Sequence, residues 1–280
     1  MYESLQEMWL IARRNPITLL GFAVLLAIAL VAAFAPLIAP YSPNYTDAAN
    51  ALQPPSLHHL FGTGIFGEDI FSRVLYGSRY DLGIALGAVG IGFTCGSAIG
   101  AIAGYIGGAA DEALMRFMDM VESFPSFILA MAVAGALGPS LPNLIAAIAV
   151  TNVPIYARLM RSRLLTIRGS QYALAAVGVG NPRTRVLYAH LLPNSFTPIF
   201  VQSTLQSGYA ILDAAGLSFI GLGIRLPTPE WGVMVSLGVS RIISGQWWAS
   251  FFPGLAIVVT VMGFNLIGDS LQDLLDPQRR

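Results

Sequence analysis

Residues 17–39 read ITLLGFAVLLAIALVAAFAPLIA, and this stretch decides the class of the protein. It contains no charged residue, and it is long enough for the about 20 apolar residues that a helix needs to cross a bilayer. Arg13 and Arg14 lie shortly before it, and it is too long to be the apolar core of a signal peptide. We therefore expect an uncleaved first membrane span.

The composition agrees with an integral membrane protein. Hydrophobic residues make up 55% of the 280 residues and charged residues only 11%, whereas soluble domains carry about 25% charge. The net charge is zero, so nothing indicates nucleic-acid binding. The single cysteine, Cys95, lies in an apolar run and has no second cysteine in the chain with which to form a disulfide.

The remaining hydropathy pattern predicts an all-α, polytopic bundle of about six transmembrane helices. The further apolar stretches are residues 82–108, 124–137, 144–156, 198–222 and 252–267. Residues 124–137 and 144–156 are shorter than a span and contain Pro125 and Pro154, so they are either two spans or a re-entrant hairpin. Both alternatives return the chain to the side that it left.

The arginines predict the orientation of this bundle. If both termini are cytoplasmic, eleven arginines lie inside and four lie outside, namely Arg73, Arg79, Arg225 and Arg241. Membrane proteins concentrate positive charge on the cytoplasmic side. We therefore expect residues 1–16 to be a cytoplasmic N-terminal segment and residues 41–80 and 224–250 to be outer loops around core spans at 82–270.

Two spans carry a polar or small-residue stripe. The first has glycine at every fourth position, which suits a helix-packing face better than its alternative, a pore lining; these residues are Gly92, Gly96, Gly100, Gly104 and Gly108. The second has Gln202, Gln206, Tyr209 and Asp213 on one helical arc. Since Asp at a span centre costs roughly 2.5 to 3.5 kcal/mol, this stripe faces either the translocation pathway or a hydrogen-bonded helix contact.

No residue pattern predicts catalysis, a cofactor site or a metal site. The chain has no lysine and no Gly-x-x-x-x-Gly-Lys phosphate loop, so we expect no ATP site of its own. The adjacent His58 and His59 point in different directions, which favours a solvated loop. Asp269, Asp273 and Asp276 are expected to cap a helix or pair with arginines, and Asp111, Glu112, Asp119 and Glu122 to lie on a cytoplasmic surface helix.

A basic loop at residues 158–194 separates two apolar regions. Its arginines are Arg158, Arg161, Arg163, Arg168, Arg183 and Arg185. Within it, YALAAVGVG at residues 172–180 predicts a short helix with small side chains, which Gly180 and Pro182 end. A segment of this kind offers a soluble partner a surface to bind.

This loop resembles the cytoplasmic loop of ABC-transporter permeases, written Glu-Ala-Ala, three residues, Gly, nine residues, Ile-x-Leu-Pro. Ala175, Ala176, Gly180, Leu192 and Pro193 fall on that pattern. Two positions depart from it, because Leu174 stands where the family has Glu and His190 where the general motif has Ile. The resemblance implies that the missing carboxylate affects one polar contact to the ATPase and not the docking itself.

Three other segments extend the resemblance over nearly the whole chain, to the C-type subunits of dipeptide, oligopeptide and nickel importers. These segments are FGTGIFGEDIFSRVLYG at 61–77, LSFIGLGIRLPTPEWGVM at 217–234 and FNLIGDSLQDLLDP at 264–277. The resemblance implies an ABC type I importer permease fold in one transmembrane domain over residues 1–280. It also implies a bacterial inner membrane location, with the loops at 41–80 and 224–250 in the periplasm.

The same resemblance implies a non-catalytic subunit that forms half of a translocation pathway for peptides. Its implied partners are a homologous B-type permease, an extracytoplasmic substrate-binding protein, membrane lipid and two cytosolic ATPases that bind ATP and Mg²⁺. The ATPase-docking residues would be Tyr172, Leu174, Ala175, Ala176, Gly180, Pro182, His190, Leu192 and Pro193. An ion-coupled secondary transporter, or the same architecture carrying nickel or metal chelates, is the alternative.

Overall fold

The structure is a computed structural model that describes residues 16–275, and within that range it contains helices and no strands. The long helices are α2 (Pro16–Ile38), α3 (Ile70–Ile106), α6 (Leu141–Ile167), α9 (Leu192–Phe219) and α11 (Trp248–Leu275). The shorter ones are η1 (Ala48–Asn50), α4 (Gly108–Glu122), α5 (Ser126–Leu137), α7 (Gln171–Gly178), α8 (Arg183–Arg185), η2 (Val186–Leu191) and α10 (Trp231–Val239). The predicted all-α class is confirmed.

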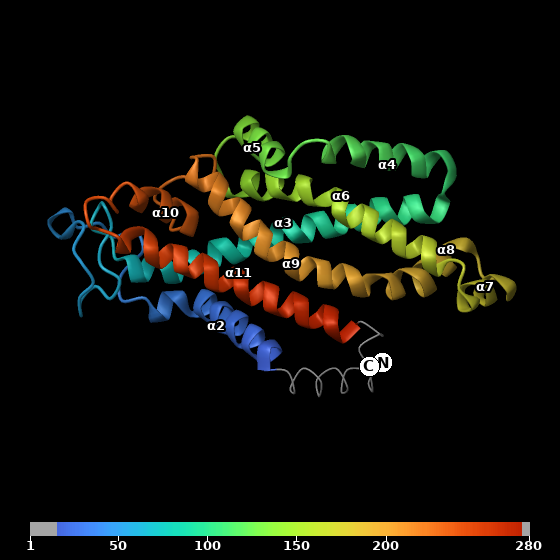
Figure 1. Cartoon of the computed structure of the whole chain (residues 1–280), viewed down its shortest axis with the longest axis horizontal. Helices are drawn as coiled ribbons and strands as arrows, with labels where there is room; N and C mark the ends of the chain where they lie inside the picture. The colour runs from blue at the N-terminus through green and yellow to red at the C-terminus, as the bar shows by residue number, and fades with distance from the viewer. Residues whose placement is uncertain (1–15, 276–280) are drawn as a thin grey trace.

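The long helices lie side by side along one axis, and the connections gather at the two ends (Figure 1). Helices α7 and α8 lie at one end, whereas residues 41–69 and α10 lie at the other. The segments that the arginine count assigns to opposite sides of a membrane are therefore at opposite ends of the bundle. Most of predicted segment 1–16 and Asp276 lie outside the described residues.

Four described helices are long and apolar enough to cross a membrane, namely α2, α3, α6 and α11. Helices α4 and α5 are long and apolar enough to cross a membrane only as a pair, and this pair is bent by 86°. Helix α9 runs alongside them but is less apolar than these four helices, because polar side chains are spaced along it. The predicted bundle of about six spans thus corresponds to four apolar helices, one broken pair and α9.

Three helix limits differ from the predicted apolar stretches. Helix α3 begins at Ile70, because Asp69 caps it through a bond from the Ser72 N–H to its carboxylate, so residues 70–80 of the predicted outer loop are helical. Helix α6 continues to Ile167, so the first ten residues of the predicted basic loop are helical. Residues 144–156 lie inside α6, which is long enough to cross a membrane, whereas α5 is long enough only together with α4.

Helices α3 and α6 form the closest packing of the bundle. A Cβ atom on Gly92, Gly96, Gly100 or Gly104 would lie 2.6 to 3.1 Å from the Cβ of Asn152, Tyr156, Met160 or Leu164, respectively. Both series advance by four residues, so one glycine face meets one ridge of α6. Gly108 does not belong to this face, because the helix is interrupted at Gly107 and Gly108 has open space beside it.

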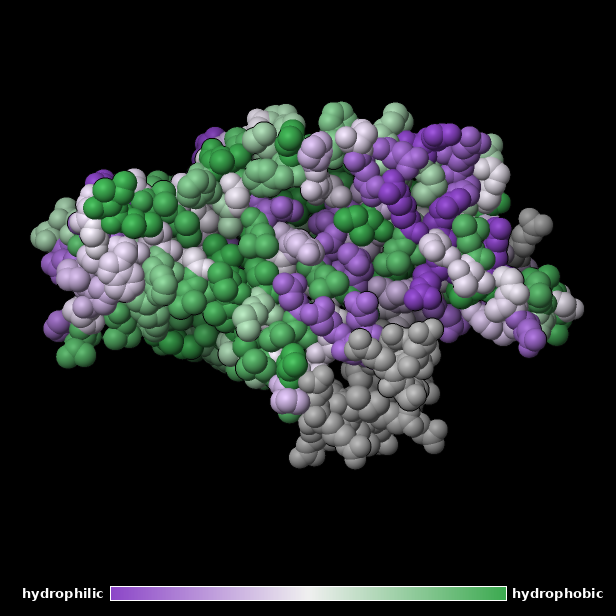
Figure 2. Space-filling view, viewed as in Figure 1, coloured by the Kyte–Doolittle hydropathy of each residue, from purple (hydrophilic) through white to green (hydrophobic). Residues whose placement is uncertain are grey.

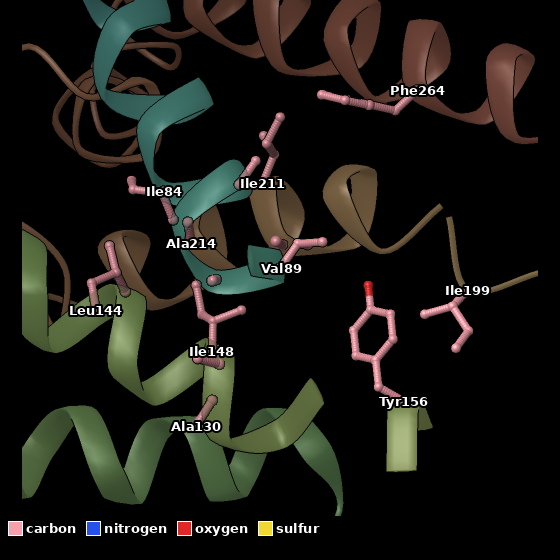
Figure 3. Packing of buried hydrophobic residues seen from close by; sticks show 14 of the residues in the cluster. Ile84, Val89, Ala130, Leu144, Ile148, Tyr156, Ile199, Ile211, Ala214 and Phe264 are labelled. Carbon is pink, nitrogen blue, oxygen red and sulfur yellow. The ribbon is translucent and has the colours of Figure 1, made fainter. Parts of the chain in front are cut away.

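The buried core connects five helices. Figure 3 shows side chains from α3, α5, α6, α9 and α11 pointing toward one another, among them Ile84, Ile148 and Ile211, each of which is fully buried. In Figure 2 the hydrophobic colour covers α2 and the first turns of α11, and the hydrophilic colour gathers over α4 and the last turns of α11. This distribution suits a bundle whose α2 side faces lipid.

Candidate coupling, pathway and outer-loop sites

Helix α7 forms where the Ala-rich sequence predicts it. Gly180 ends it with a positive φ of 83°, and the N–H groups of Gly180 and Asn181 donate to the carbonyls of Val177 and Ala176. Glycine adopts this left-handed conformation without the penalty of a Cβ atom. The predicted helix and its end at Gly180 are therefore confirmed.

The two faces of α7 differ in the size of their side chains. Ala173 and Ala176 are 2% and 8% exposed and face the bundle. The rest of the helix surface is open, because the large apolar residues Tyr172, Leu174 and Val177 are between 43% and 60% exposed. The alternation of small and large residues in YALAAVGV therefore places its large apolar groups outward.

The nine predicted docking residues differ in their exposure to solvent. Tyr172, Leu174, Ala175, Gly180, Pro182 and Pro193 are exposed, His190 and Leu192 are half-buried, and Ala176 is buried. Ala176 therefore supports α7 from within and does not present a surface to a soluble partner. Sequence reasoning missed Val177, Val179 and Tyr188, which are 56%, 79% and 68% exposed and extend the apolar face. Their signal was large apolar residues among the small and basic residues of the predicted basic loop.

Two arginines of the predicted basic loop bind α4 instead of facing outward. The Arg161 Nε and Nη2 atoms lie 2.5 and 2.7 Å from the two Asp111 carboxylate oxygens. Arg158 pairs with Asp119, at 2.8 Å, and with Glu122. The predicted helix with acidic residues exists as α4, and its charges tie it to the end of α6 that leads into α7.

The polar stripe on α9 is divided between two environments. Gln206 is 5% exposed, and its Nε2 atom donates to the Asn152 side-chain oxygen on α6 at 3.2 Å. Gln206 therefore fits the helix-contact alternative. Tyr209 is 58% exposed, and Gln202 and Asp213 are half-buried, so these three reach the uncovered surface of α9.

The end of the bundle opposite α7 carries a polar cavity of about 380 Å³ within residues 41–69. His58 is exposed at its rim, as expected for a solvated loop. His59 departs from that expectation, because its Nδ1 atom lies 2.9 Å from an Asp69 carboxylate oxygen and its ring centre lies 5.0 Å from that of Tyr41. The described residues contain no cluster of three or more His, Cys, Asp or Glu side chains suited to a metal.

The acidic end of α11 is open to solvent. Asp269 and Asp273 are exposed on its last turns, and Asp276 lies beyond the described residues. The expected pairing of these aspartates with arginines stays a prediction.

Comparison with known proteins places both ends of the chain in transport permeases. Residues 96–280 match the family described as "Binding-protein-dependent transport system inner membrane component". Residues 4–55 match "N-terminal TM domain of oligopeptide transport permease C".

Curated relatives match over nearly the full length. "Dipeptide transport system permease protein DppC" of Alkalihalophilus pseudofirmus is 43% identical over 96% of this chain and 88% of its own. "Probable D,D-dipeptide transport system permease protein DdpC" of Escherichia coli is 44% identical over 99% and 92%. "Glutathione transport system permease protein GsiD" of Escherichia coli is 40% identical over 97% and 90%.

Proposed function

Because this chain belongs to the family of inner membrane components of binding-protein-dependent transport systems, we propose that it forms half of the translocation pathway of an ABC importer for di- or oligopeptides. The peptide class is supported by the names of several relatives, which specify dipeptides or glutathione. In this proposal the chain is a non-catalytic subunit, and ATP with Mg²⁺ binds to two partner ATPases.

The exposed apolar face of α7 is the observation that carries the coupling role. Tyr172, Leu174 and Val177 expose large apolar groups on a helix that lies at one end of the bundle, outside its apolar helices. Such a face is stable when a groove of another protein covers it, and a helix in an apolar groove is a common recognition mode. We assign the groove to a cytosolic ATPase, which places α7 and both chain termini on the cytoplasmic side.

Movement of α7 has a direct route into the bundle. Helix α6 leads into α7, and Arg158 and Arg161 connect its last turns to α4. Closure of the ATPases would therefore shift α7, α6 and α4 together, and the bundle would convert between discrete inward-open and outward-open arrangements.

We assign the partner permease and the binding protein to two other exposed surfaces, one on α9 and one formed by residues 41–69 and α10. Tyr209 and Asp213 lie on the uncovered side of α9, where lipid would leave their polar groups unsatisfied. We assign that side to the substrate pathway and to the B-type permease that completes it. The extracytoplasmic binding protein would deliver substrate to the end formed by residues 41–69 and α10.

The docking role is tested by changing the charge of α7. In a complex reconstituted with its partner permease, ATPases and binding protein, Val177→Asp is expected to lower ATP-dependent peptide uptake at least tenfold. A carboxylate on this face must lose its hydration when the groove closes over it. Thr184→Asp is the matched control, because Thr184 is also exposed in the same loop but lies outside α7.

Three results would contradict the proposal. Normal uptake by the Val177→Asp complex would remove the docking role of α7. Uptake by this chain and its partner permease without ATPases would favour an ion-coupled transporter. An Asp213→Asn complex with unchanged uptake rate and peptide preference would remove Asp213 from the pathway.

A further inference from the structure

Two buried carboxyl groups meet at the outer end of the bundle. Asp81 comes from the α3 helix, and Glu230 lies in the N-cap position of α10; both side chains are fully buried, with 0% exposure. The Asp81 carboxylate accepts a hydrogen bond from the N–H of Trp231, the residue next to Glu230, so the two buried residues are neighbours. They therefore join an outer-loop helix to a long helix of the bundle.

Glu230 has the partners of an ionised carboxylate. Its two oxygens accept hydrogen bonds from the backbone N–H groups of Gly232 and Val233, each at 2.8 Å. Both donors belong to the first turn of α10, whose N-terminal end also favours negative charge. Burial raises the pKa of the Glu230 carboxyl, and these two N–H groups act against that rise.

Asp81 lacks such a set of donors. Its Oδ2 atom accepts one bond, from the Trp231 N–H at 3.2 Å, and its Oδ1 atom has no hydrogen-bond partner among the described residues. A second buried polar atom at this junction, the Ser218 hydroxyl oxygen beside Glu230, also lacks a well-oriented partner among them. An ionised Asp81 would thus hold an unpaired oxygen next to a second carboxylate.

Neighbouring charges do not relieve this repulsion. Arg73, two turns earlier on α3, directs its Nη1 atom to the carbonyls of Pro43 and Pro227. Among the described residues, no arginine or histidine forms a salt bridge with Asp81 or Glu230. Two carboxyls in contact within a buried site cannot both ionise without a large penalty.

We propose that Asp81 and Glu230 form a proton-binding site, in which the Asp81 carboxyl is protonated at neutral pH and donates its O–H to the Glu230 carboxylate. The proton then gives Asp81 Oδ1 a hydrogen-bond partner. One negative charge remains, on the Glu230 carboxylate that caps the N-terminus of α10. The site does not depend on which substrate the chain transports.

The proton holds α10 in place. Trp231 packs beside this pair, is 2% exposed, and donates its Nε1–H to the Val74 carbonyl on α3 at 2.9 Å. The folded state keeps a proton that an unfolded aspartate would lose above its ordinary pKa of about 4, so the stability of this contact falls as the pH rises. Loss of the proton would place two charges together and release the first turn of α10 from α3.

The first experiment observes the proton directly. The infrared spectrum of the full chain in lipid nanodiscs at pH 7 is compared with that of Asp81→Asn. We expect the difference spectrum to show the loss of a carbonyl band of a protonated carboxylic acid. The amide keeps the shape of Asp81 and can donate to Glu230, so Asp81→Asn should fold. The corresponding difference spectrum of Asp213→Asn distinguishes this band from any band of Asp213, which is half-buried.

The second experiment measures the consequence for α10. Amide hydrogen exchange of residues 231–239, corrected for the intrinsic pH dependence, should accelerate at least tenfold in the unmodified chain between pH 6 and pH 9. In Asp81→Asn the corrected rate should stay constant, because no proton is left to lose. An infrared difference without an acid band, or a corrected exchange rate with the same pH dependence in both proteins, would overturn the proposal. The first result would instead fit an ionised pair bridged by a cation.

Discussion

Single residues decide how closely the helices approach, and glycine has the clearest effect. Gly96 is the best example, because a Cβ atom there would lie 2.6 Å from the Tyr156 Cβ and closer still to the Val153 carbonyl oxygen. Gly90, on the same helix, faces open space, and a Cβ atom there would have no neighbour within 4 Å. Glycine on α3 therefore serves packing at one position and leaves room for a larger residue at another.

We expect Gly96→Leu to destabilise the chain while Gly90→Ala is neutral or stabilising. Leucine gains up to about 1 kcal/mol of helix propensity over glycine. Overpacking costs about 1 to 3 kcal/mol, and here rigid backbone is part of the obstruction, so the packing penalty prevails. Thermal unfolding in detergent measures both variants, and equal midpoints would contradict the assignment of α3 and α6 as a close-packed pair.

At the scale of elements, ion pairs connect α6 to α4. Asp111 accepts two hydrogen bonds from Arg161, and Arg158 reaches Asp119 and Glu122. These pairs are partly exposed, and such pairs contribute only about 0.2 to 1 kcal/mol to stability. Their value to the proposed importer lies in fixing α4 relative to the helix that enters α7.

Breaking this connection should uncouple ATP hydrolysis from uptake more than it unfolds the chain. Arg161→Asp places two negative charges together, and we expect the number of ATP molecules hydrolysed per peptide to rise severalfold. The double variant Arg161→Asp with Asp111→Arg restores opposite charges and should recover most of the coupling. Arg163→Ala is the control at an exposed position of the same helix. A failure of the charge exchange to rescue would show that the pair does not transmit movement.

At the scale of the whole molecule, the two ends of the bundle have distinct chemistry. One end presents the apolar face of α7, and the other presents the polar cavity in residues 41–69 and the carboxyl pair beneath α10. This asymmetry matches the distribution of arginines and the proposed direction of transport. It also separates the proposed ATPase contact from the proton site by the length of the long helices.

Cysteine labelling tests this orientation in intact cells. In a Cys95→Ser background, Ile243→Cys should react with a membrane-impermeant maleimide, because Ile243 is 97% exposed at the proposed outer end. Thr184→Cys, in the loop beside α7, should react only after the membrane is permeabilised. The reverse pattern would place α7 outside and would remove the proposed contact with cytosolic ATPases.

Much of this protein could be predicted from local sequence. Charge-free apolar runs such as residues 17–39 indicate spans, the Ala-rich stretch before Gly180 indicates α7, and the arginine count predicts an orientation. Each of these features depends on residues close together in the chain, where hydropathy, helix propensity and backbone conformation act. The limits of α3 and α6 were less predictable, because an N-cap and packing extend both helices beyond their apolar runs.

Only the tertiary structure decided which distant residues meet. It set Gly92 to Gly104 against α6 but left Gly108 aside, turned Arg158 and Arg161 toward α4, and divided Gln206 from Tyr209 on the same stripe. It also buried Asp81 against Glu230, two residues whose separate surroundings in the sequence carry no sign of each other. The physical reason is that burial and electrostatic interaction depend on distance in space, which a local pattern does not contain.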